Sequence, residues 1–163
     1  MKKIYLFIVL VIIAIDQITK WIANTSLELH EQNPVMPFFN WTLMYNYGAA
    51  FSFLSNAGGW QRWFFTIVAT IISIVLVVWI YRLKHNEKWL GVALSLILGG
   101  AIGNLIDRVI FGYVIDFIQW YYERFYWPAF NIADASICVG TVILLATSFM
   151  ADPNDSKVDN SNS

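Results

Sequence analysis

The chain has 163 residues, of which 58% are hydrophobic and only 13% are charged, whereas a soluble domain usually carries about 25% charged residues. Its net charge of −1 gives no sign of a polyanion-binding surface, so nucleic acid is not an expected partner. One cysteine and two histidines exclude an internal disulfide and leave few ligands for a metal, so neither a metal nor a cofactor is expected. The composition therefore predicts a small integral membrane protein.

Four apolar stretches come close to the roughly 20 helical residues that a bilayer crossing requires. They are predicted at about residues 4–23, 63–81, 89–106 and 133–150. These spans predict an all-α, four-helix membrane domain over residues 1–151, followed by a disordered cytoplasmic tail at 152–163. Lys2 and Lys3 before the first span also resemble the start of a cleavable signal peptide. No small-residue cleavage site follows, so a retained helix is expected.

The distribution of lysine and arginine predicts the orientation of the spans. Lys2 and Lys3 precede the first span, and the short link between the second and third spans is also basic. The basic residues in this link are Arg82, Lys84 and Lys88. The other two connections are long and contain few basic residues. Both termini and the short link are therefore expected on the cytoplasmic side.

The two long connections, which lie on the outer side in this orientation, are rich in aromatic residues. Residues 38–47 and 114–122 favour short extended segments because they combine aromatic and β-branched side chains. Residues 49–54 and the region around Trp60 are apolar enough to form a helix at the membrane interface. These segments either plug the outer end of the bundle or form a platform for a substrate.

The notable polar groups of the spans fall in the outer half of the membrane. With a helix rise of about 1.5 Å per residue, Asp16 and Lys20 lie about 18 and 24 Å from the inner face, and Asn104 about 22 Å from it. Ionisable groups at such depths are costly and suggest a function. Their clustering at one end predicts a single site and not a channel lined from face to face.

Several of these groups also have structural interpretations. Asp16 and Lys20 are spaced to share one helix face, which suits an internal ion pair. Arg108 cannot face the adjacent Asp107, so it needs another acceptor, such as a carboxylate or a substrate carbonyl. Small residues that suit close helix packing occur at Gly99, Gly100 and Gly103.

Asp116, in the second outer connection, and Asp134, near the start of the fourth span, are the candidate catalytic pair. Adjacent carboxylates in a low-dielectric site cannot both ionise easily, so one keeps a proton while the other accepts one from water. Such a pair can hydrolyse an amide without a metal or a covalent nucleophile. Proton relay, or capping of the fourth helix by Asp134, are the alternatives.

Five segments, in order along the chain, resemble the motifs of one family. They are Asp16-Gln17-Ile18-Thr19-Lys20, Asn46-Tyr47-Gly48-Ala49-Ala50-Phe51-Ser52, Gly99-Gly100-Ala101-Ile102-Gly103-Asn104-Leu105-Ile106-Asp107-Arg108, Val114-Ile115-Asp116-Phe117 and Phe130-Asn131-Ile132-Ala133-Asp134. The family is that of the bacterial lipoprotein signal peptidases, also called signal peptidase II. The resemblance covers residues 16–134, and five motifs in order are far more specific than any one of them.

The resemblance implies an aspartic endopeptidase of the bacterial cytoplasmic membrane. Such enzymes remove the signal peptide from prolipoproteins, just before a cysteine that carries a diacylglyceryl group. The resemblance also implies that Asp116 and Asp134 form the catalytic dyad, near the outer leaflet. Substrate contacts or support are implied for Asn46, Asn104, Arg108, Asn131, Asp16 and Lys20. The expected partners are lipid-modified precursors and membrane lipids, and a monomer is expected because four spans need no partner subunit.

Two other classes of protein remain compatible with the sequence. A proton-coupled small membrane transporter also uses intramembrane carboxylates, but it requires polar groups along a path to the inner face. The inner halves of these spans are almost wholly apolar. A non-catalytic assembly or lipid-binding protein would tolerate the replacement of Asp116 by asparagine.

Overall fold

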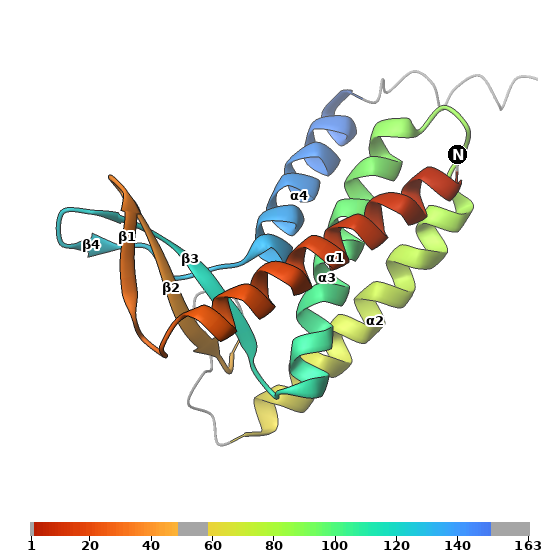
Figure 1. Cartoon of the computed structure of the whole chain (residues 1–163). Helices are drawn as coiled ribbons and strands as arrows, with labels where there is room; N and C mark the ends of the chain where they lie inside the picture. The colour runs from red at the N-terminus through yellow and green to blue at the C-terminus, as the bar shows by residue number, and fades with distance from the viewer. Residues whose placement is uncertain (1, 49–58, 151–163) are drawn as a thin grey trace, which may run out of the picture.

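The computed structural model describes residues 2–48 and 59–150, which form four helices and a small sheet beside one end of the helices (Figure 1). The helices are α1 (Lys2–Ser26), α2 (Trp60–Arg82), α3 (Lys88–Ile110) and α4 (Ile132–Met150). All four are long and apolar enough to cross a membrane, which confirms the four predicted spans. The predicted segment at 49–54 and the predicted tail at 152–163 lie outside the described residues.

Two helix ends differ from the prediction. Trp60, which was assigned to an interfacial segment, is the first residue of α2. α3 continues to Ile110 and therefore includes Asp107 and Arg108, which were assigned to the outer connection. The two charged residues lower the hydropathy of the sequence, as the end of a membrane helix does. Asp107 is nevertheless only 1% exposed, because it pairs with Lys20 inside the bundle.

α3 is the centre of the bundle. It packs against the other three helices. Half of the residues in the apolar 18-residue stretch of α3 are buried, compared with 11% in the apolar stretch of α2. Glycine permits this packing, because a Cβ added to Gly103 would lie 2.6 Å from Asp16 Oδ2, and one added to Gly100 would collide with Ala133 O. The predicted close helix packing is confirmed.

The sheet consists of β1 (Gln32–Met36), β2 (Phe39–Asn46), β3 (Val114–Tyr122) and β4 (Phe125–Tyr126), in that spatial order and antiparallel throughout. β2 and β3 confirm the two predicted extended segments. The predicted fold class, an all-α bundle with a small β-like segment, is confirmed in part. The four helices and the β-like segments are present, but these segments pair with each other and recruit two further strands into a sheet. Met44 lies opposite Asp116, and Asn46 lies opposite Val114, so the pairing brings β2 next to Asp116.

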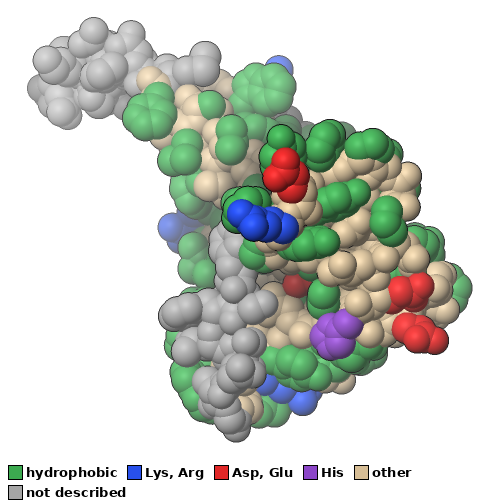
Figure 2. Space-filling view, turned by 90° about the vertical axis from the view of Figure 1, so that its left-hand side faces the viewer, with side chains coloured by type: hydrophobic (Ala, Val, Ile, Leu, Met, Phe, Trp, Pro, Cys, Tyr) green, Lys and Arg blue, Asp and Glu red, His purple; other side chains and the backbone are tan. Residues whose placement is uncertain are grey.

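The outer surface of the molecule is largely apolar. On α2, for example, Ile67, Ile71 and Val75 are each more than half exposed. Figure 2, which views the side where the sheet lies, shows hydrophobic side chains across this face and only scattered charged ones. Burying these side chains in lipid removes them from water, and this agrees with a membrane environment for the helices.

Candidate active site

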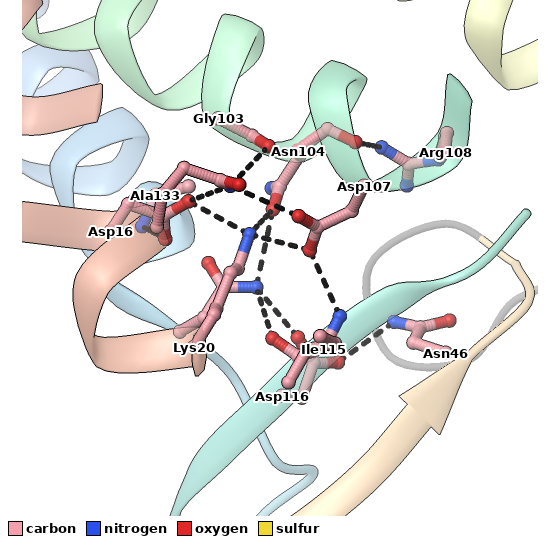
Figure 3. Close-up of polar contacts among 12 residues, drawn as sticks. Asp16, Lys20, Asn46, Gly103, Asn104, Asp107, Arg108, Ile115, Asp116 and Ala133 are labelled. Carbon is pink, nitrogen blue, oxygen red and sulfur yellow. Dashed lines mark hydrogen bonds and ion pairs between the residues drawn. The ribbon is translucent and has the colours of Figure 1, made fainter. Parts of the chain in front are cut away.

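The predicted site residues meet where the sheet joins the bundle, and Figure 3 labels Asp16, Lys20, Asn46, Asn104, Arg108 and Asp116 among them. They come from α1, β2, α3, β3 and the beginning of α4, and a single chain of hydrogen bonds and ion pairs connects all eight. These residues are Asp16, Lys20, Asn46, Asn104, Arg108, Asp116, Asn131 and Asp134. The structure therefore brings together every side chain that the sequence suggested for the site.

Asp116 on β3 is buried, with 2% of its surface exposed. Two amides donate to its carboxyl group: Asn131 Nδ2 to Oδ1 at 2.7 Å, and Asn46 Nδ2 to Oδ2 at 3.1 Å. Burial raises the pKa of Asp116 from its ordinary value of 3.8 to about 8, and the charge of Asp134 acts in the same direction, whereas the two amides lower it. One proton therefore tends to stay on the pair of Asp116 and Asp134 near neutral pH.

Asp134 lies in the first turn of α4 and exchanges hydrogen bonds with Asn131. The Asp134 N–H donates to Asn131 Oδ1 at 2.9 Å, and the Asn131 N–H donates to Asp134 Oδ2 at 3.3 Å. This reciprocal pair is a capping box, so capping by Asp134 is confirmed. The cap uses only Oδ2, while Oδ1 accepts a hydrogen bond of 2.8 Å from Asn104 Nδ2. Helix capping therefore leaves Asp134 able to take part in chemistry.

Asn131 links the two carboxyl groups. Its side-chain amide donates to Asp116 and its backbone N–H donates to Asp134, while the side chain itself is fully buried. The same amide also donates to Asn104 Oδ1 at 3.2 Å. Because one buried residue bonds to both aspartates, it fixes their relative position.

Lys20 is 2% exposed and lies at the centre of a buried polar network. Its ammonium group is 2.8 Å from Asp16 Oδ2 and 2.9 Å from Asp107 Oδ2, and it donates to Asn104 Oδ1 at 2.9 Å. Three acceptors match the three N–H bonds of an ammonium group. The ion pair predicted between Asp16 and Lys20 is therefore confirmed, as part of a larger network.

Sequence reasoning missed two members of this network. Asp107 accepts from Lys20 and from the Ile115 N–H, and Gln17 donates to Asp107 Oδ1 at 3.0 Å. Extending the third span by one turn would have found Asp107, because Asn104 and Asp107 are then three residues apart on one helix face.

Arg108 finds backbone acceptors, and within the described ranges it makes no ion pair with a carboxylate. Nη2 donates to Gly48 O at 3.1 Å and Nη1 donates to Asn104 O at 3.4 Å. A second arginine, Arg62, donates to Arg108 O at 3.0 Å and to Val109 O at 2.8 Å, and thus satisfies carbonyl groups at the end of α3. Arg62 was not predicted for the site, although it is the only lysine or arginine in residues 24–62, the first long connection predicted from the sequence.

A groove of about 540 Å³ lies elsewhere, on the aromatic part of the sheet. It is lined by residues 36–39, 120–122 and 125–127. None of the eight site residues lines it. The polar network, and not this aromatic groove, therefore identifies the candidate active site.

Comparison with known proteins assigns the family. A family model described as signal peptidase (SPase) II matches residues 8–150. A lipoprotein signal peptidase of Acinetobacter baumannii is 54% identical over 149 residues, which cover 91% of this chain and 85% of the relative. A lipoprotein signal peptidase of Pseudomonas putida is 50% identical over 156 residues, which cover 94% of this chain and 91% of the relative.

The fold is also similar to solved structures. One, described as a bacterial membrane enzyme studied by the in meso method, superposes with a TM-score of 0.78 at 32% identity, covering 99% of this chain and 93% of that chain. A second such structure gives a TM-score of 0.75 at 34% identity, covering 92% of this chain and 95% of that chain. The sequence and structural matches agree, and the chain belongs to the signal peptidase II family of aspartic peptidases.

Proposed function

We propose that the protein removes the signal peptide from diacylglyceryl-modified prolipoproteins by hydrolysing the peptide bond before the lipidated cysteine, with Asp116 and Asp134 as the catalytic dyad. The observation that carries this proposal is the pair of aspartates bridged by Asn131 inside an apolar bundle. Membership of the signal peptidase II family supplies the reaction class.

The two carboxyl groups divide the proton transfers between them. The ionised one takes a proton from water while the water oxygen attacks the scissile carbonyl carbon, and the protonated one donates to the carbonyl oxygen. Collapse of this tetrahedral intermediate breaks the C–N bond as the leaving nitrogen receives a proton. The products are the carboxylate of the signal peptide and the free amine of the lipidated cysteine. The pair titrates as a unit, so the proton belongs to both groups.

The neighbouring side chains hold the dyad and the substrate. Asn46, Asn104 and Asn131 donate to the dyad carboxyl oxygens and so fix their orientation. Arg108 lies beside the dyad at the end of α3 and bonds to Gly48 O and Asn104 O. Its remaining N–H groups suit the carbonyl groups of an extended substrate, which has no water to bond at this depth. The aromatic sheet offers an apolar surface for the acyl chains.

We propose that the site faces the outer leaflet of the bacterial cytoplasmic membrane. The Lys2 ammonium lies 3.8 Å from the centre of the Tyr81 ring, so the basic residues at the start of α1 and the end of α2 share one end of the bundle. Lys20 and Asp134 lie toward the other end. Since basic residues favour the cytoplasmic side, the site is then external. Thiol labelling tests this topology: in a Cys138→Ala background, Asn86→Cys reacts from the cytoplasmic side and Leu29→Cys from the outside.

The distribution of buried charge favours a hydrolase over a transporter. The buried charged side chains of the described residues are Asp16, Lys20, Asp107 and Asp116, and all of them belong to this one network. No polar path to the cytoplasmic end is formed by them. We also propose that residues 1–151 form one membrane domain, because α1, α3, β3 and the start of α4 all contribute side chains or backbone to the site.

Cleavage of a synthetic precursor by purified enzyme tests the proposal. Wild type cuts the diacylglyceryl-modified precursor directly before the cysteine, as mass spectrometry of the product shows. Asp116→Asn and Asp134→Asn each lose at least about 100-fold in turnover, because general acid–base catalysis contributes about 10²–10⁴-fold. Glu28→Gln, at an exposed carboxylate of the same chain, serves as the matched control and keeps wild-type turnover. Full turnover by Asp116→Asn or Asp134→Asn would exclude these two residues as the catalytic dyad. Equal cleavage of an unmodified precursor would exclude recognition of the lipid.

A further inference from the structure

Asp107 holds the backbone of the residue that directly precedes Asp116. Its Oδ2 accepts a hydrogen bond of 3.1 Å from the Ile115 N–H (Figure 3), and its side chain is 1% exposed. Hydrogen bonds to an ionised acceptor are about twice as strong as those between neutral groups. This contact therefore ties β3 to α3 at the position from which the Asp116 side chain extends.

Asp16 makes the equivalent contact for Asp134. Its Oδ1 accepts a hydrogen bond of 2.8 Å from the Ala133 N–H, and its side chain is fully buried. The Ala133 N–H belongs to the first turn of α4, where backbone N–H groups have no partner within the helix and favour a negative charge. α1 is thereby tied to the start of α4, directly before Asp134.

Lys20 joins these two supports. Its ammonium group lies 2.8 Å from Asp16 Oδ2 and 2.9 Å from Asp107 Oδ2, so one cation bridges both carboxylates. It also donates to Asn104, whose amide donates to Asp134. Removing one partner of such a buried group leaves an unpaired charge, so the three side chains act together.

We infer that Asp16 and Asp107 are positioning residues, each of which fixes one dyad aspartate by holding the backbone N–H immediately before it, with Lys20 keeping the two supports together. The inference rests on the proposed function in that Asp116 and Asp134 perform the chemistry. The separation of the two catalytic carboxyl groups is then set by the buried ion-pair network as well as by the sheet. A misplacement of about 1 Å at such a pair can cost about 100-fold in rate.

The test compares two substitutions of Asp107. Asp107→Ala removes the acceptor for the Ile115 N–H. Asp107→Asn keeps an oxygen that can accept from the Ile115 N–H but removes the negative charge that faces Lys20. Ser95→Ala is the matched control, because Ser95 is fully buried in the same helix and donates only to Gly91 O, at 2.6 Å, among the described contacts. Each variant is purified as a monodisperse peak, and kcat and KM are measured on diacylglyceryl-modified precursor.

Asp107→Ala is expected to lower kcat by about 100-fold while KM stays within about twofold, because Asp107 does not touch the substrate. Asp107→Asn recovers most of this loss, and Ser95→Ala keeps the wild-type kcat. A purely structural role predicts less folded protein but a normal kcat for the folded fraction, and this result overturns the inference. Equal losses in Asp107→Asn and Asp107→Ala also overturn the inference, because the hydrogen bond from the Ile115 N–H, which only Asp107→Asn keeps, then contributes nothing to kcat. Full turnover by Asp116→Asn instead overturns the proposed function itself.

Discussion

Replacing Asp116 by asparagine is expected to make the protein more resistant to alkaline solution while removing its activity. The side chain is 2% exposed, and burial raises the pKa of Asp116 from 3.8 to about 8. Between these two values the folded chain keeps a proton that the unfolded chain has released. The folded state thus binds more protons, and its stability falls as the pH rises through this window. Asparagine has no proton to lose, so it removes the share of this dependence that Asp116 contributes.

The size of the effect follows from the raised pKa. Each pH unit within the window costs the wild type up to about 1.4 kcal/mol, which amounts to about 4 kcal/mol between about pH 5 and pH 8. The asparagine also destabilises the folded state, because its NH₂ group faces the side-chain amide of Asn46 or of Asn131, each of which donates a hydrogen bond to the carboxyl group in the wild type. That cost is about 1–3 kcal/mol and does not change with pH. The slope of stability against pH, and not its value at one pH, is therefore diagnostic.

Thermal unfolding in detergent micelles measures this slope, with the fluorescence of the eight tryptophans as the signal. The wild-type Tm is expected to fall between about pH 5 and pH 8, while the Tm of Asp116→Asn changes much less. Glu28→Gln, at an exposed carboxylate, is the control and follows the wild type. Parallel curves for Asp116→Asn and wild type would refute the view that Asp116 is buried with a raised pKa.

Three further substitutions test the surroundings of the dyad. Arg108→Gln should raise KM for the modified precursor by about 10-fold or more, because a hydrogen bond to a charged group contributes about 1.5–3 kcal/mol; an unchanged KM would contradict its assignment to substrate binding. Arg62→Gln should lower the free energy of unfolding by about 1–3 kcal/mol, because it leaves carbonyl groups at the end of α3 without their donor, and Arg62→Lys should restore part of it. Gly103→Ala should destabilise the bundle by about 1–3 kcal/mol and slow cleavage, because its Cβ would lie 2.6 Å from Asp16 Oδ2; wild-type stability and turnover together would exclude this close approach.

The helices could be predicted from the sequence because a bilayer imposes a minimum length of apolar residues. Their ends were harder to predict, since charged residues such as Asp107 and Arg108 resemble a helix end when their partners on other elements are unknown. The sheet was only partly predictable. The aromatic and β-branched pattern of residues 38–47 and 114–122 indicates extended backbone, but pairing between two distant connections is a property of the whole fold.

The candidate site shows the same division between local and non-local information. The pair of Asp16 and Lys20 follows from helical spacing, and it is confirmed. The double role of Asn131 and the support from Asp107 depend on α1, α3, β3 and α4 meeting at one point. No pattern within one segment contains that information.

Single-turnover cleavage of diacylglyceryl-modified precursor by Asp116→Asn, Asp134→Asn and the double variant tests the central claim most directly. Two carboxyl groups that share one proton act as a unit, so each single variant should lose about 10²–10⁴-fold in rate, and the double variant should lose little more than the more impaired single variant. Losses that multiply in the double variant, or full turnover by either single variant, would contradict an aspartic dyad at Asp116 and Asp134.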